Sequence, residues 1–128
     1  MGKSLTLNDM EHRIIRPIWK DPRIHSAVNC ASFSCPNISV EAYNGNVIDK
    51  QLNTSFSAWV NSHKGVVLTN SKIYLSQIFS WYGSDFGNET QMRDFISNYV
   101  NDKNIKEKLL NGNNEIYFEK YNWNLNEL

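Results

Sequence analysis

The chain has 128 residues, with 13 basic and 13 acidic side chains and a formal net charge of zero at pH 7. Because it has no excess of Lys and Arg to neutralise phosphates, we do not expect a dedicated nucleic-acid-binding protein. Hydrophobic residues make up 41% and aromatic residues 12% of the chain, which is typical of a globular protein. No apolar run approaches the roughly 18 residues that a bilayer-spanning helix needs. The N-terminus shows no secretory signal, so we expect no membrane span and leave the compartment open.

The first element that we expect is a short helix. Residues 6–9 have the pattern of a capping box, and the apolar spacing continues to about Ile15. Pro17 is expected to end this helix or to bend the chain. The dipeptide at 21–22 then predicts a new start, with Asp as the cap and Pro at the first helical position. The alternation of apolar and polar residues over 24–29 indicates an extended segment.

The rest of the chain alternates between amphipathic helices and short strands. Apolar stripes at helical spacing predict the helices, and a short polar turn between two β-branched runs predicts the hairpin. The expected elements are a helix over 47–62, a β-hairpin over 66–75, helices over 89–100 and 102–112, and a strand over 115–120. We therefore predict a single α+β domain over residues 1–128, with a small antiparallel sheet packed with three or more helices.

Residues 21–36, which read DPRIHSAVNCASFSCP, stand out as a candidate site. They contain both cysteines of the chain and one of its three histidines. Polar groups in a protein interior need partners, so this density of thiols, Ser and Asn is unusual for a plain core. A solvated loop, in turn, would not interleave Ile24, Val28 and Phe33 with two thiols. We interpret the stretch as a functional site.

Nucleophilic catalysis is one chemistry that these residues can support. A thiolate attacks a carbonyl carbon while a histidine takes and returns the proton. Cys30 is the candidate nucleophile, and either His25 or His12 is the candidate base. The backbone N–H groups after the cysteine, together with Asn29 or Ser32, are candidates for an oxyanion hole. Glu11, Asp21 and Asp85 are candidates for orienting the base.

Five further residues are candidates for substrate binding. The two arginines lie near the thiols in sequence, and each can bind a carboxylate or phosphate or pair with a neighbouring acidic residue. Aromatic residues crowd the segment 74–86, where the more frequent role is core and the alternative is a groove with a polar anchor. The candidates are Arg16, Arg23, Ser32, Cys35 and Asp85.

Three alternatives to catalysis remain open for the same stretch. A zinc site could use His25, Cys30, Cys35 and His12, but structural zinc sites usually show C-x2-4-C pairs, so we predict neither a metal nor another cofactor. A Cys30–Cys35 disulfide is feasible, although the C-x-x-C motif of redox centres is absent. The cysteines and histidine can also simply pack in the core.

At these residues the chain resembles the domain of unknown function 547 family. The segments that carry the resemblance are LNDMEH at 7–12, RP at 16–17, DPRIH at 21–25, NCAS at 29–32, SCP at 34–36, YLS at 74–76, IF at 78–79, WY at 81–82, DF at 85–86 and YNWNLN at 121–126. Two positions depart from the family pattern, because Arg13 stands where members commonly carry Gly and Asn37 where they carry a second Pro. Members usually have an upstream helical segment, so the resemblance implies that this chain corresponds to the C-terminal portion of the family unit.

The resemblance also implies a distant similarity to papain-like and transglutaminase-like thiol enzymes. In those enzymes the Cys opens a helix packed on an antiparallel sheet that carries the His, whereas here His25 precedes Cys30. Relatives are bacterial and often exported. We therefore expect a thiol-dependent hydrolase or acyltransferase for a small-molecule or peptide substrate. The rival hypothesis is a non-catalytic binding or interaction domain in which the motif is structural. We also expect self-association through surface that the absent upstream segment would cover.

Overall fold

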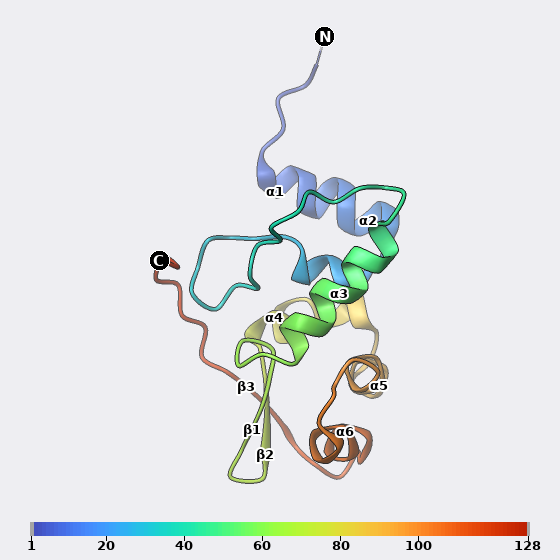
Figure 1. Cartoon of the computed structure of the whole chain (residues 1–128), viewed down its shortest axis with the longest axis vertical. Coiled ribbons are helices and arrows are strands. Elements are labelled where there is room, and N and C mark those ends of the chain that lie inside the picture. The colour runs from blue at the N-terminus through green and yellow to red at the C-terminus, as the bar shows by residue number, and fades with distance from the viewer. Residues whose placement is uncertain (1, 128) are drawn as a thin grey trace.

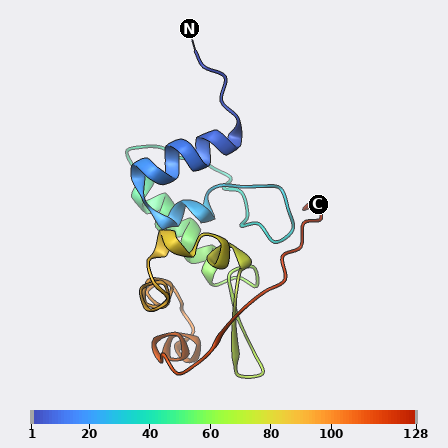
Figure 2. The same cartoon turned by 180° about the vertical axis from the view of Figure 1, so that it is seen from behind.

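The computed structural model describes residues 2–127, and its N-terminal helix lies at one end of the molecule (Figures 1 and 2). Three segments form this helix without a break: α1 (Leu7–Asp9), the π-helical η1 (Met10–Ile15) and α2 (Arg16–Trp19). The capping box predicted at 6–9 is confirmed, since Asp9 N donates to Thr6 Oγ1 at 3.0 Å and Thr6 N donates to Asp9 Oδ2 at 3.1 Å.

The helix continues past Pro17 to Trp19, so of the two predicted outcomes, an end or a bend at Pro17, the end is wrong. The π-helical turns before it change the hydrogen-bond pattern, and Arg16 N donates to Glu11 O. Pro17 comes directly after these turns, at the second position of α2. The helix ends at Lys20, which has a left-handed backbone with φ of 52°.

The first half of the segment predicted to be extended, residues 24–26, lies instead in a 3-10 helix, η2 (Pro22–Ser26), and residues 27–29 form no strand. The predicted cap is confirmed, since Arg23 N donates to Asp21 Oδ1 at 3.0 Å and Pro22 holds the first helical position. The alternation of polarity misled the prediction because consecutive residues of this turn, Ile24 to Ser26, are all buried. A single tight turn can bury His25 beside apolar neighbours when its polar atoms find partners.

The helix predicted over 47–62 is confirmed as α3 (Ile48–Val60), which crosses the middle of the molecule in Figure 1. The predicted hairpin is confirmed as β1 (Val66–Thr69) and β2 (Lys72–Leu75), which pair in antiparallel register. Its two turn residues, Asn70 and Ser71, both have positive φ, as a type I′ turn requires.

The predicted final strand is confirmed as β3 (Ile116–Phe118), but its direction corrects the expectation of a wholly antiparallel sheet. β3 runs parallel to β2, so the sheet within residues 2–127 is mixed, with the order β1-β2-β3. The physical reason is the connection. Helices lie between β2 and β3 in sequence, and such a crossover returns the chain to run in the same direction.

The crossover contains four helical segments: α4 (Gln77–Trp81), the 3-10 turn η3 (Gly83–Phe86), α5 (Glu89–Ser97) and α6 (Lys103–Leu110). The last two are the helices predicted over 89–100 and 102–112. Asn88 caps α5 by accepting from Gln91 N at 2.9 Å, and Asp102 caps α6 by accepting from Ile105 N at 3.0 Å. Figure 1 shows both helices beside the hairpin end of the molecule.

Helices and sheet share one core, and the predicted α+β class is confirmed. The core residues are Phe56, Trp59, Val60, Val66, Ile73, Leu75, Ile78, Phe79, Phe86, Met92, Ile96, Val100 and Leu109. Most of them come from α3, the sheet and the crossover, so the core lies mainly in the C-terminal half of the chain. Among residues 2–127, no helix combines the length and apolarity that crossing a bilayer requires.

The C-terminal tail runs back along the outside of the fold to the loop that follows η2 (Figures 1 and 2). Its backbone joins that loop in antiparallel fashion. Phe33 N donates to Asn124 O at 2.8 Å, and Asn126 N donates to Ala31 O at 2.9 Å. A further bridge pairs Ser32 with Leu125. The tail therefore holds the cysteine-bearing loop from the far end of the sequence.

Candidate functional site

Cys30 lies in the loop after η2, and its side chain is exposed. It does not open a helix, unlike the thiol of the papain-like enzymes. Its Sγ lies 3.1 Å from Ser32 Oγ and 3.3 Å from the hydroxyl oxygen of Tyr121, and these two oxygens are 2.9 Å apart. Two hydroxyl groups thus face one sulfur atom, and both can donate to it when it is ionised.

These contacts change the ionisation of the thiol. Burial acts to raise the pKa of Cys30, but hydrogen bonds from Ser32, Tyr121 and Cys35 outweigh it and lower this pKa from 9.0 to about 7. Burial, followed by the bond to Cys30, raises the pKa of the Tyr121 hydroxyl, which therefore stays protonated as a donor. A substantial thiolate fraction at neutral pH is the form in which cysteine acts as a nucleophile.

The neighbouring loop residues are tied to one another. Cys30 N donates to Cys35 Sγ at 3.0 Å, and Ala31 N donates to Asn29 Oδ1 at 2.8 Å. The Asn29 amide in turn donates to Pro36 O at 2.8 Å. Of the groups predicted for an oxyanion hole, the Ala31 N–H and the Asn29 amide therefore already have partners. Ala31 holds a left-handed backbone with φ of 58°.

His25 is almost fully buried, and Asp85 fixes its ring. Its Nε2 lies 2.8 Å from Asp85 Oδ2. The ionised carboxylate can only accept, so Nε2 carries the hydrogen and Nδ1 carries the lone pair. Burial lowers the pKa of His25, and the bond to Asp85 opposes this without overcoming it, so the ring is neutral at pH 7. Among residues 2–127, the side-chain hydrogen bond of His25 is the one at Nε2.

Asp85 also holds Arg16 of the N-terminal helix. The guanidinium donates from Nε at 2.7 Å and from an Nη at 2.9 Å, a bidentate pair that is the first cause of the lowered pKa of Asp85. The ring of Tyr82 packs against both partners of Asp85. Its centroid lies 4.5 Å from that of the His25 ring and 4.6 Å from the guanidinium carbon of Arg16. The carboxylate thus connects the N-terminal helix, η2 and η3.

His12 is engaged in the same polar cluster but in a different way. Its Nδ1 accepts from Arg16 at 3.0 Å, so the lone pair that a general base needs is occupied. Glu11 lies beside it, with a carboxylate oxygen 3.9 Å from the other ring nitrogen. His12, Arg16 and Asp85 line a cavity of about 460 Å³ together with Lys20.

A smaller cavity, of about 110 Å³, brings the thiols and a histidine together. Its lining consists of Glu11, His25, Val28, Cys30, Cys35, Ile78, Trp81, Tyr82, Tyr121 and Trp123. We call it the thiol cavity. His25 lines it and His12 does not, which separates the two candidate bases. No hydrogen bond joins Cys30 to a histidine among residues 2–127.

Arg23 lies apart from both cavities. Its guanidinium binds Asp21 at 2.6 Å, Asp49 at 2.8 Å and the side-chain oxygen of Asn53 at 2.8 Å. These contacts join η2 to α3. Of the two interpretations left open for this arginine, the structure therefore shows pairing with acidic neighbours.

Two residues of the thiol cavity region were not predicted as site residues. Tyr121 hydrogen-bonds the thiol across 91 positions of sequence, and Tyr82 stacks on His25. The signal for Tyr82 was its place in the aromatic segment 74–86, which was interpreted as core. Tyr121 belongs to the YNWNLN tail, where the resemblance gave a pattern but no role.

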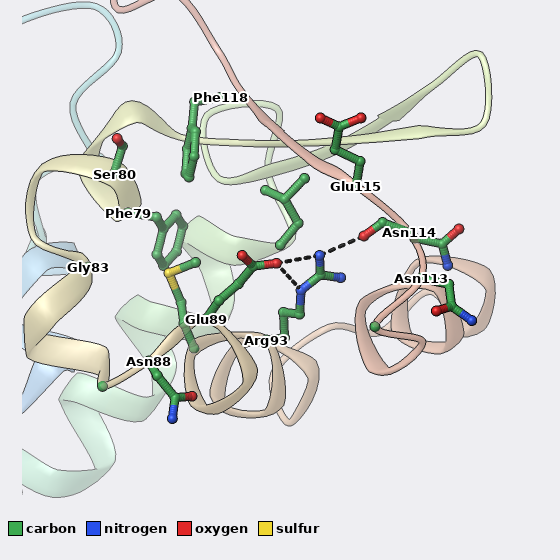
Figure 3. A pocket seen from close by; sticks show the side chains of 14 residues that line it. Phe79, Ser80, Gly83, Asn88, Glu89, Arg93, Asn113, Asn114, Glu115 and Phe118 are labelled. Atoms are coloured by element: carbon green, nitrogen blue, oxygen red, sulfur yellow. Dashed lines mark hydrogen bonds and ion pairs between the residues drawn. The ribbon is translucent and has the colours of Figure 1, made fainter.

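A third cavity, of about 590 Å³, lies away from the thiols beside α5 (Figure 3). Arg93 is buried at its wall, and its guanidinium makes hydrogen bonds to Glu89, to Leu109 O and to Asn114 O. The charge is thus paired and its donors are taken up by the backbone of the segment before β3.

In residues 2–127, no three or more His, Cys, Asp and Glu side chains converge as metal ligands.

Comparison with known proteins finds a similarity over the N-terminal part of the chain. No curated protein and no solved structure matches the chain. One family model matches residues 1–60, a range that contains the N-terminal helix, η2, the cysteine-bearing loop and α3. The quoted segments beyond residue 60 lie outside this match. That model is of the family described as "Protein of unknown function, DUF547", and residues 1–60 of the chain are similar to it.

Proposed function

We propose that this protein is a thiol-dependent hydrolase or acyltransferase, with Cys30 as the nucleophile and His25 as the general base. One observation carries the proposal: both side chains line the thiol cavity, while Asp85 holds the opposite ring nitrogen of His25 at 2.8 Å. Nucleophile, base and orienting carboxylate are the three parts of thiol and serine catalysis, and they recur in unrelated chain orders. In this proposal, the likeness to papain-like enzymes concerns the catalytic chemistry and not the order of the residues in the chain.

The geometry suggests how the steps divide between the residues. Cys30 is already partly ionised through Ser32 and Tyr121, so it attacks the carbonyl carbon without a base in direct contact. The same two hydroxyl groups then donate to the oxyanion that forms beside the sulfur. The leaving group departs, and an acyl thioester remains on Cys30. The Nδ1 lone pair of His25 removes a proton from the incoming water or amine, which releases the acyl group.

The thiol cavity favours a small apolar acyl group. Its volume is about 110 Å³, and Trp81, Tyr82 and Trp123 supply aromatic walls. Such walls bury apolar surface and stack against planar groups. A short acyl ester or thioester, or the small terminal residue of a peptide, fits this description better than an internal peptide segment.

The test is turnover of p-nitrophenyl acetate by the full chain and by single variants. C30A is expected to abolish turnover, and H25N to reduce it by about 10²–10⁴-fold because general-base catalysis is lost. H63N is the matched control, since His63 is exposed and lies outside the thiol cavity. The proposal would be overturned if C30A turned over the ester as fast as the wild type, or if H25N and H63N had equal rates.

A second reading is supported by the bonds within the loop. Asn29 bonds Pro36, and the Ser34 hydroxyl accepts from Asn122 N at 2.8 Å. In a non-catalytic binding or interaction domain, the motif would serve only to tie loop and tail together. That role predicts loss of stability on Asn29→Ala with no turnover in the wild type. The catalytic role predicts turnover.

We also propose that the protein self-associates through its N-terminal helix. Leu7 is 84% exposed, Ile18 63% and Trp19 64%, although all three are large apolar residues. Exposed apolar patches commonly mark protein interfaces, and these three side chains belong to one helix. Sedimentation should show association that rises with concentration and that Ile18→Lys weakens. A concentration-independent monomer would contradict it.

A further inference from the structure

The two cysteines of the loop, Cys30 and Cys35, are neighbours in space. Cys30 N donates to Cys35 Sγ at 3.0 Å. A turn in which Cys35 N donates to Ser32 O at 3.1 Å brings the second cysteine back to the first. Both are free thiols, and both line the thiol cavity. Rotation of the Cys30 side chain toward its own amide nitrogen would bring the sulfur atoms together.

The surroundings of the two thiols are unequal. Cys30 is exposed, whereas Cys35 is 3% exposed. Burial raises the pKa of Cys35 to about 11, while the pKa of Cys30 is lowered to about 7. A reagent in solution therefore meets the sulfur of Cys30 first, and a substantial fraction of that sulfur is thiolate at neutral pH. Exposure and thiolate character are the two properties that make a cysteine susceptible to oxidation.

We propose that Cys30 is an oxidation site for small hydroperoxides, and that Cys35 converts the oxidised Cys30 into a Cys30–Cys35 disulfide. In the first step the thiolate sulfur attacks a peroxide oxygen. An S–O bond forms and the O–O bond breaks, so the sulfur is oxidised to sulfenic acid and the peroxide is reduced to an alcohol or water. In the second step the Cys35 sulfur attacks the sulfenic sulfur. The S–O bond breaks, and its oxygen leaves as water with the Cys35 proton.

Ser32 and Tyr121 suit the first step. Their hydroxyl oxygens lie 3.1 and 3.3 Å from Cys30 Sγ, so they are placed to donate to the oxygen that leaves as the O–O bond breaks. The cavity of about 110 Å³ admits hydrogen peroxide or a short alkyl hydroperoxide. Cys35 forms part of the same wall, so the sulfenic acid arises next to the thiol that removes it.

This chemistry does not use His25 and does not rest on acyl transfer. It would nevertheless stop acyl transfer, because a disulfide removes the Cys30 nucleophile until a small thiol reductant restores it. Cys35 also shortens the lifetime of the sulfenic acid, which protects Cys30 from further, irreversible oxidation. The loop would thus respond reversibly to peroxide.

The experiment treats the reduced full chain with one equivalent of hydrogen peroxide, unfolds it, alkylates the remaining thiols and measures the intact mass. The wild type should lose two hydrogens, take up no alkyl group and regain both thiols with dithiothreitol. C35S should gain one oxygen that dimedone traps on Cys30. C30S should keep Cys35 reduced. H25N should behave as the wild type, which separates this test from that of the hydrolase.

Three results would overturn the proposal. The first is wild-type protein that gains two or three oxygens on Cys30 while Cys35 remains alkylatable. The second is disulfide formed only between chains, seen as dimers on a non-reducing gel. The third is oxidation of Cys30 no faster than that of free glutathione. C35A serves beside C35S, with circular dichroism of both, so that misfolding of one variant does not decide the outcome.

Discussion

The ring of His25 is anchored through Nε2 to Oδ2 of Asp85 at 2.8 Å, although the two residues are 60 positions apart. The same carboxylate accepts a bidentate pair from Arg16. One acidic side chain therefore fixes the orientation of the candidate base and holds the N-terminal helix against η3. Its loss should affect chemistry and stability together.

Replacement of Asp85 by Asn should lower both the free energy of unfolding and the rate of ester turnover. Arg16 and His25 lose a charged acceptor in a partly buried setting, and such a loss costs about 1–3 kcal/mol of unfolding free energy. His25 also loses the partner that selects its tautomer, so ester turnover should fall. Urea unfolding measures the first effect. Asp94→Asn is the control, because Asp94 is exposed on α5, and an equal loss in both variants would contradict the role given to Asp85.

The stability of the fold should decline in two steps as pH falls. Burial lowers the pKa of His25 below 6.5, so the unfolded chain takes up a proton at higher pH than the folded chain. His25 therefore contributes full stability above about pH 6.5 and less below it. The hydrogen bond from Arg16 lowers the pKa of Asp85 below 3.8, so its contribution is present above that value and lost as pH falls through the folded pKa.

Urea unfolding at a series of pH values tests this, with H25Q beside the wild type. The variant should lose the decline that begins near pH 6.5 and keep the acid step of Asp85. A variant whose unfolding free energy follows the wild type through both steps would show that His25 is not buried in its neutral form.

Tyr121→Phe should make the Cys30 thiol less acidic. Removing one hydroxyl donor destabilises the thiolate, so the thiol pKa should rise from about 7 toward its ordinary value of 9.0. The pH dependence of iodoacetamide alkylation, measured in a C35S background, reports this pKa. Tyr117→Phe is the matched control, since Tyr117 bonds Glu115 far from the thiol. An unchanged profile in Tyr121→Phe would refute the contact.

Arg93→Met should cost about 2 kcal/mol of unfolding free energy, because two carbonyl oxygens lose their donor beside the core. Arg13→Met is the matched control. Both arginines pair with a carboxylate four residues earlier, but the Arg13 side chain is 77% exposed and that of Arg93 6%. The midpoint of urea unfolding should move for Arg93 only. Equal shifts would mean that the buried carbonyl contacts of Arg93 add nothing.

Much of the fold could be predicted from local pattern. The apolar stripe of α3 and the turn at Asn70–Ser71 each specify their element, because helical spacing and left-handed turn residues act over a few positions. The direction of β3 could not be predicted, since it depends on how α5 and α6 return the chain. The 3-10 turn at 22–26 was missed because one turn is too short to show a helical period.

The candidate site was predicted in its residue types and only partly in its arrangement. Local sequence placed Cys30 and His25 close together, and the structure shows that they line one cavity. It could not choose between His25 and His12, because the choice depends on Asp85 and Arg16, which meet through the fold. Tyr121 lies 91 positions from Cys30, and no local pattern reports such a contact.

The most direct test of the proposed function is the intact mass of the chain, measured at intervals after mixing with p-nitrophenyl acetate. The wild type should carry at most one acetyl group, on Cys30, and lose it as turnover proceeds. H25N should accumulate the acetyl-Cys30 thioester because its release lacks a base. If no acetyl group forms on Cys30, or if it is released equally fast from H25N and the wild type, Cys30 and His25 do not form a catalytic pair.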